Sequence, residues 1–182
     1  MVTARVIFMK KLITFFVVML LLVSFNFNAL AVDSDVTRLT LTGIQGVYVI
    51  VEEMQPNIQK YAAKAGLAKE QLQKDIELRL SEMGIRVLSK DEWMMTPGKP
   101  VLYVSVNTHE AERYWYAYDV KIDLQQVVKM EANPKVNTLA ATWSLNMTGM
   151  ANIGSLKIIK GDMEVLLGRF QQAYWAVNRK RY

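Results

Sequence analysis

The only histidine in the sequence is the first residue to test for chemistry. His109 lies in the segment THEAER, close to Glu110 and Glu112. One imidazole with scattered carboxylates lacks the ligand number and spacing of a zinc or iron site. It also offers no recognisable Ser-His-Asp arrangement. We therefore predict that this polar segment is an exposed hairpin turn between two strands.

Paired carboxylates are the second candidate. Asp119 and Asp123 flank Lys121 on one face of a predicted strand. General acid–base catalysis needs two carboxylates in different, partly buried environments, whereas a lysine between them is typical of a solvated face. The sequence also lacks a phosphate-binding loop, a dinucleotide fingerprint, a nucleophile elbow and a zinc-protease helix. We predict no enzymatic activity, catalytic residue, cofactor or metal site, and a hydrolase with an unrecognised site is a distant alternative.

The segment YWYAYDVKID, residues 114–123, is rich in aromatic side chains and then alternates apolar with charged residues. In a strand, Tyr114, Tyr116 and Tyr118 share one face with the apolar residues that follow, so this face should point toward the core. Trp115 shares the opposite face with the charged residues. It is the one side chain of this segment that a solvated strand does not explain.

Two readings of this tryptophan remain open. A cluster of exposed apolar groups marks a partner or ligand surface, whereas a single tryptophan can equally be covered by a loop of the protein itself. Trp143 or Trp93 would join Trp115 in such a cluster if the neighbouring strands are in register. The candidate binding surface consists of Trp93, Met94, Met95, Trp115 and Trp143.

The N-terminal residues have the pattern of a secretory signal peptide. Lys10-Lys11 precedes a short apolar run over residues 12–23, and small residues at Ala29 and Ala31 form a cleavage motif. We predict cleavage between Ala31 and Val32. The alternative is an uncleaved membrane anchor, but the apolar run falls short of the roughly 20 residues that span a bilayer.

Charge and cysteine content restrict the partners. Three of the 22 basic residues and none of the 17 acidic residues precede Val32, which leaves 19 basic against 17 acidic residues. This near balance argues against a nucleic-acid partner. The absence of cysteine excludes disulfides, thiolate metal sites and a lipid anchor at the cleavage site. An exported protein without disulfides is typical of the bacterial periplasm.

The hydrophobic pattern predicts one α+β domain over residues 32–182, a two-layer sandwich in the order β-α-β-β-β-β-α. Two amphipathic helices should cover one face of a mostly antiparallel sheet of about five strands. The expected helices span residues 65–84 and 156–177, and the expected strands span residues 38–54, 85–88, 101–107, 114–128 and 138–147. In the last strand, alternate residues from Leu139 to Met147 should lie on one side.

Several segments together resemble a family of uncharacterised exported bacterial proteins. The resemblance lies in GIQGVYVIVEEM, GLAKEQLQKDIELRLSEMGIRVL, AYDVKIDLQQVV, AATWS and RFQQAYWAVN, and it spans most of residues 32–182. It implies no activity and no site residues. In architecture the chain is similar to small envelope accessory proteins such as the lipopolysaccharide-assembly lipoprotein and transport auxiliary lipoproteins, although it lacks their lipid-anchor cysteine.

These observations predict a periplasmic, non-enzymatic accessory protein of the bacterial cell envelope that binds another envelope protein. The alternative is a carrier or binder of a lipid-like or glycan ligand. An open strand edge or an apolar surface patch favours the first function, whereas an apolar pocket of several hundred Å³ between helices and sheet favours the second. Contact with a membrane is expected only through an uncleaved signal segment.

Overall fold

The computed structural model describes residues 33–178. These residues form an α+β fold with a four-stranded mixed sheet and five helices. The helices are α2 (Asp35–Arg38), α3 (Pro56–Lys64), α4 (Lys69–Glu82), α5 (Lys90–Met95) and α6 (Lys157–Asn178), and a 3₁₀ turn, η1 (Leu39–Leu41), follows α2. The strands are β1 (Tyr48–Val51), β2 (Val101–Glu112), β3 (Trp115–Lys129) and β4 (Asn137–Asn152). No helix within residues 33–178 is long and apolar enough to cross a bilayer.

The four strands are ordered β1-β2-β3-β4 across the sheet. The pairs β2–β3 and β3–β4 are antiparallel, whereas β1 pairs with β2 in parallel. The expectation of about five strands was therefore wrong, because residues 85–88 contribute only an isolated bridge between Val47 and Val87. The long first strand was also wrong. Ser34 forms a capping box with Thr37 and starts α2, so the strand does not begin until Tyr48.

The β2–β3 hairpin extends further than its sequence indicates. His109 lies within β2 opposite Ala117, and the chain reverses at Arg113 and Tyr114. Tyr114 adopts a positive φ of 69°, which a tight turn requires. The prediction of a turn at THEAER was wrong because its polar residues pair with the beginning of β3.

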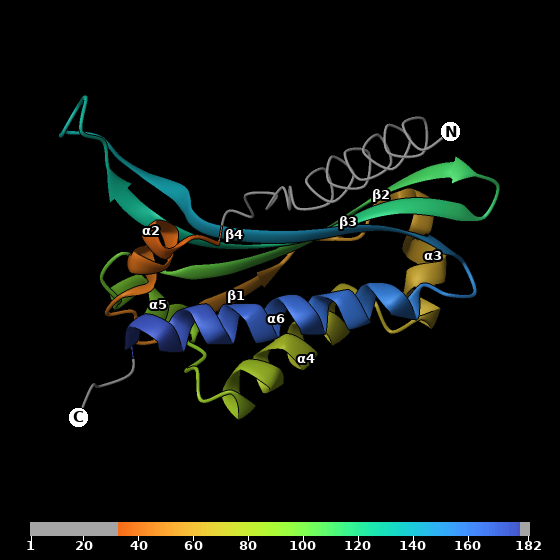
Figure 1. The fold of residues 1–182 in the computed structure, drawn as a ribbon, viewed down its shortest axis with the longest axis horizontal. Coiled ribbons are helices and arrows are strands. Elements are labelled where there is room, and N and C mark those ends of the chain that lie inside the picture. The colour runs from red at the N-terminus through yellow and green to blue at the C-terminus, as the bar shows by residue number, and fades with distance from the viewer. Residues whose placement is uncertain (1–32, 179–182) are drawn as a thin grey trace, which may run out of the picture. The chain divides into compact units, whose positions relative to one another are not determined.

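The core lies between the sheet and the two long helices. The row Tyr116, Tyr118, Val120, Ile122 and Leu124 on β3 is buried, as the alternation predicts. Tyr114, which was expected on the same face, is 41% exposed because it belongs to the turn before β3. Helix α6 contacts β3 and β4, helix α4 contacts β1, and both helices lie on the same side of the sheet (Figure 1). Both predicted helices are confirmed, and their predicted apolar faces are buried: Leu72, Ile76, Leu80 and Met83 on α4, and Ile159, Met163, Leu166 and Phe170 on α6.

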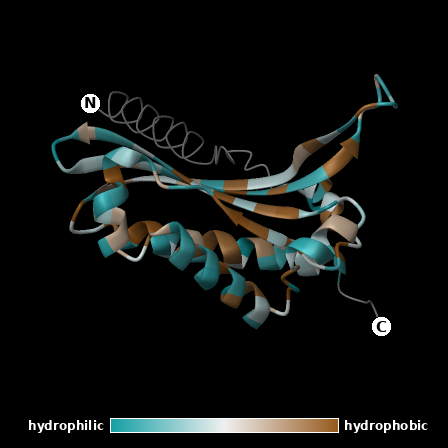
Figure 2. Cartoon of the chain, turned by 180° about the vertical axis from the view of Figure 1, so that it is seen from behind, coloured by the Kyte–Doolittle hydropathy of each residue, from teal (hydrophilic) through white to brown (hydrophobic). Residues whose placement is uncertain are grey.

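Hydrophobic residues are concentrated where these layers meet. Figure 2 shows β1 as a hydrophobic strand, and its Val49 and Val51 are buried.

Helix α4 ends at a glycine, as the sequence predicts. Gly84 has a φ of 76°, which a residue with a side chain rarely adopts.

A β-bulge divides β4 into two parts with opposite orientation. The register shifts so that Leu124 pairs with Trp143 while Gln125 pairs with Ala141, which leaves Thr142 as the extra residue. Trp143 and Leu145 therefore face the core, whereas Leu139 is exposed. The expectation that Leu139 and Trp143 share one side was wrong for this reason.

The beginning of the described chain is attached to this core by a polar contact. The buried Trp143 donates its indole N–H to Asp33 Oδ1 over 2.9 Å, and Arg38 donates two hydrogen bonds of 2.7 Å to the same carboxylate. The bond from Arg38, assisted by that from Trp143, lowers the pKa of Asp33 although burial opposes the shift. The carboxylate thus joins the start of α2 to the centre of β4.

Replacement of Asp33 by alanine should reduce the free energy of unfolding by about 1–3 kcal/mol, because it leaves the buried indole N–H without an acceptor. Glu131→Ala, an exposed carboxylate in the β3–β4 turn, is the control and should change it by less than about 0.5 kcal/mol. Urea unfolding measures both. Equal stability of the two variants would contradict this role for Asp33.

The same carboxylate should make stability depend on pH. Its lowered pKa means that its ionic contribution is present above the ordinary value of about 4 and is lost as the pH falls through the lowered pKa. The difference in unfolding free energy between the wild type and Asp33→Asn should therefore be largest near neutral pH and shrink in acid. A difference that grows on acidification would reverse the sign that the structure requires.

Candidate functional site

Trp115 lies on the face of the sheet opposite α4 and α6, which we call the outer face. It is 44% exposed, and it pairs with Glu112 on β2 and Asn152 on β4. Met150 lies on the same face and is 56% exposed. Trp115 and Met150 are thus large apolar side chains close together at the hairpin end of the outer face.

Trp93, Met94 and Met95 lie at the other end of the sheet. They belong to α5, where Trp93 stacks on Tyr48 of β1 with ring centroids 5.2 Å apart. Tyr48 pairs with Val101 at one end of β2, and Trp115 pairs with Glu112 at the other end. At about 3.3 Å per residue, Val101 and Glu112 are roughly 35 Å apart along the strand. Helix α5 therefore does not cover Trp115. Its Met94 and Met95 are exposed in a separate region of the surface.

Trp143 was wrongly included in the candidate surface. Its side chain is completely buried, packs on Phe170 of α6 with ring centroids 5.2 Å apart, and is bonded to Asp33. The bulge at Thr142 is the physical reason, since it fixes which residues of β4 face the helices. The five predicted residues thus belong to two separate exposed regions and the core.

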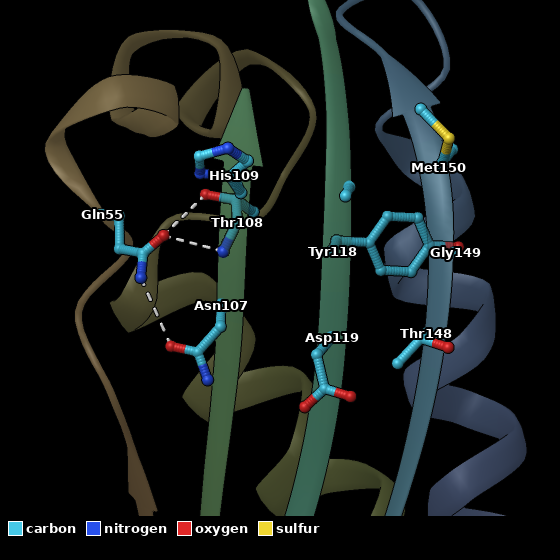
Figure 3. A pocket seen from close by; sticks show the side chains of 10 residues that line it. Gln55, Asn107, Thr108, His109, Tyr118, Asp119, Thr148, Gly149 and Met150 are labelled. Carbon is cyan, nitrogen blue, oxygen red and sulfur yellow. Dashed lines mark hydrogen bonds between the residues drawn. The ribbon is translucent and has the colours of Figure 1, made fainter. Parts of the chain in front are cut away.

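A shallow hollow of about 650 Å³ lies on the outer face, one outer-face position along β3 from Trp115. Figure 3 shows the residues that line it. Ala117 occupies its floor, between His109 on β2 and Met150 on β4, and is the next outer-face residue along β3 from Trp115. Because alanine is the smallest side chain of this row, the surface is lower here than on either side. The lining residues are Gln55, Asn107, Thr108, His109, Ala117, Tyr118, Asp119, Thr148, Gly149 and Met150.

Hydrogen bonds hold several of the lining side chains in place. Gln55 accepts from the N–H of Thr108 over 2.7 Å and from its hydroxyl over 3.0 Å, and its amide donates to Asn107 (Figure 3). On the other side, Asn146 donates to Asp119 Oδ1 over 2.7 Å. The hollow therefore has a fixed rim of amide and carboxylate oxygens.

Below this rim, Tyr118 joins the sheet to α6. Its ring reaches across to Gly149 on β4 (Figure 3), and its hydroxyl donates to Asp162 Oδ2 over 2.6 Å. Burial, together with the bond to this carboxylate, raises the pKa of Tyr118 to about 12. The phenol consequently stays protonated at neutral pH and acts as a structural donor.

The titratable residues that the sequence singled out lie on β2 and β3. Among residues 33–178 no three His, Asp, Glu or Cys side chains are placed to hold a metal ion. His109 is exposed. Lys121 Nζ lies 2.9 Å from Asp123 Oδ2. Asp123 is nevertheless buried, and its Oδ1 has no hydrogen-bond partner among the described residues. The expectation of a solvated face was therefore wrong at Asp123.

Comparison of the chain with protein-family models, with curated proteins and with solved structures found no match.

Sequence reasoning missed most residues of the hollow because they are brought together by pairing between strands. Asn107 and Thr148 both pair with Asp119. The spacing of residues within one segment cannot predict such contacts between strands. The sequence did contain one signal that the strand over residues 137–152 has an unusual surface. Residues 137–152 contain no charged side chain, which is unusual for a strand that proves to lie at a sheet edge.

Gly149 should be essential for the contact between Tyr118 and Asp162. A Cβ at this position would lie 2.5 Å from the Tyr118 hydroxyl oxygen, so Gly149→Ala must displace the ring and should cost about 1–3 kcal/mol of stability. Gly168→Ala is the matched control. Nothing lies within 4 Å of its added Cβ within α6, and it should stabilise the helix by about 0.5–1 kcal/mol. Thermal unfolding of both variants checks the expected opposite signs, and equal signs would contradict the close packing at Gly149.

Proposed function

We propose that this chain is an exported, non-enzymatic accessory protein of the bacterial cell envelope that binds another protein through the outer face of its sheet. The proposal treats residues 1–31 as a signal peptide that is removed, which brings the domain to the periplasm. It takes the fold as a two-layer sandwich in which α4 and α6 cover one face of the sheet. The other face then remains for a partner.

The observation that carries this proposal is the exposure of Trp115 and Met150 together on the outer face. Tryptophan and methionine are enriched at protein interfaces, and aromatic anchors contribute most of the binding energy in many of them. The hollow next to Trp115 offers a recess for a side chain of the partner. The polar rim around it supplies donors and acceptors that can fix orientation.

A lipid carrier is less well supported. Such a protein needs an enclosed apolar pocket of roughly 300 Å³ or more, whereas large side chains such as Trp143 and Phe170 fill the space between α6 and the sheet. A smaller cavity of about 200 Å³ lies at α3 and the start of α4, and charged residues such as Glu53 and Lys69 contribute to its lining. The hollow on the outer face is open to solvent.

A glycan is the second candidate ligand, and the composition of the hollow is the observation in its favour. Amide, hydroxyl and carboxylate groups surround the small floor at Ala117, and an exposed indole lies beside it. Sugars bind to such combinations because hydroxyl groups pair with the polar rim while an apolar ring face covers the aromatic side chain.

A photo-reactive amino acid at position 115 should test the protein partner directly. Crosslinking in intact cells is expected to give one or a few discrete protein adducts of defined mass. The control is the same amino acid at Leu78, which is 62% exposed on α4 on the other side of the sheet. A ladder identical at both positions would show random collisions and would contradict a partner at the outer face. Adducts that resist protease but not glycosidase would favour the glycan.

A further inference from the structure

On the outer edge of β4, several main-chain groups have no hydrogen-bond partner among residues 33–178. β4 is the last strand of the sheet within residues 33–178. The N–H of Ile153 donates to the carbonyl of Tyr114, so odd-numbered residues from Ile153 back to Trp143 direct their main-chain groups toward β3. The groups of the even-numbered residues therefore point away from the sheet.

This free edge is limited at both ends. At one end the Thr40 hydroxyl donates to the carbonyl of Thr142 over 3.2 Å. At the other end Ser155 bonds both main-chain groups of Asn152. Between these ends lies a window of four residues, which we call the β4 window: Ser144, Asn146, Thr148 and Met150.

The β4 window lacks the usual protection of a sheet edge. Natural edge strands carry lysine, other inward or outward charges, or proline, which prevent pairing with another strand. β4 contains no charged residue and no proline over its 16 residues. Its bulge lies at Thr142, outside the window. The window is therefore open to a further strand.

Apolar side chains on α6 continue this surface below the edge. Asp162 reaches Tyr118 at Gly149, whereas Lys160 bonds Asp75 on the opposite flank, toward α4. Ile158 and Val165 are one helical turn from Asp162 on its flank, and they are 50% and 47% exposed. The flank of α6 beneath β4 thus carries exposed apolar groups.

Contacts at both ends of this stretch show where Val165 lies. Phe170 packs on Trp143, and Asp162 bonds Tyr118 at Gly149. Helix α6 therefore runs antiparallel to β4, and Val165 lies beneath the segment between Trp143 and Gly149. A strand added to the β4 window must bring an apolar surface of its own to cover this flank.

We propose that the occupant is a second copy of this chain, paired antiparallel through β4 about a two-fold axis at Met147. A twofold axis sets the same uncharged strand and the same apolar helix flank against each other. Asn146 then pairs with Thr148 of the second copy and Ser144 with Met150, which gives about eight main-chain hydrogen bonds. The two sheets become one, and their outer faces form a continuous surface with a Trp115 on each side of the axis.

A charge-swap experiment tests both the dimer and its register. Sedimentation of the protein purified after expression of the full sequence should give a dimer mass for the wild type. Asn146→Lys with Thr148→Lys should weaken dimerisation at least about tenfold, because equal charges then face each other across the axis. Asn146→Lys with Thr148→Glu should restore it, since lysine then faces glutamate. Both positions are exposed, and circular dichroism checks that each variant is folded.

A monomeric wild type at all concentrations would overturn the dimer, and so would a lysine pair that leaves the mass unchanged. Failure of the glutamate variant to recover would overturn the register. Trp115→Ala should leave the dimer mass unchanged. The dimer can therefore be disproved without disproving partner binding at the outer face, and the reverse also holds.

Cysteine substitution gives a second test that does not rely on charge. The chain contains no cysteine. Met147→Cys should form a disulfide-linked dimer under mild oxidation, because equivalent Cα atoms at the axis would be about 4.5 Å apart. Thr148→Cys is more exposed, but its equivalents would be beyond the ~7 Å limit for a disulfide and should remain unlinked. The reverse result would contradict an axis at Met147.

Discussion

The buried row of β3, from Tyr116 to Leu124, lies against the helices and determines the orientation of the rest of the sheet. Because side chains alternate along a strand, burial of this row places Trp115 and Ala117 on the outer face. A shift of one residue in the register of β3 would bury Trp115 and expose the tyrosines. It would be unfavourable because the large apolar side chains of this row would be transferred from the core to water. The core thus defines the surface from which both proposals start.

Two polar contacts hold the helical elements to this sheet at either end of the β4 window. Trp143 bonds Asp33 near α2, and Tyr118 bonds Asp162 on α6. Each satisfies a polar group that would otherwise be buried without a partner. Neither uses the outward main-chain groups between Ser144 and Met150, so the same packing that stabilises the domain leaves this part of the edge available. Partner binding on the outer face and pairing at the edge are therefore compatible in one molecule.

Periodicity within one segment predicted α4, α6 and the buried face of β3, because burial of one face imposes its own repeat on the sequence. It failed where another segment decides the structure. The bulge at Thr142 is a matter of register between β3 and β4, and it reversed the expected orientation of Leu139. Residues 39–41 alternate like a strand but continue the helix that Ser34 caps. Trp115 was correctly assigned to the face opposite the core, whereas the hollow beside it depends on three paired strands and was not predictable from spacing.

The central proposal for the edge of this sheet is that a second copy of the chain pairs with β4 between Ser144 and Met150. Amide hydrogen exchange measured at several protein concentrations tests it most directly. The amides of Ser144, Asn146, Thr148 and Met150 should exchange slowly in concentrated protein and quickly after dilution. The amides of Leu145 and Met147, which point toward β3, should stay protected at both. Fast exchange of the four outward amides at every concentration would contradict the claim.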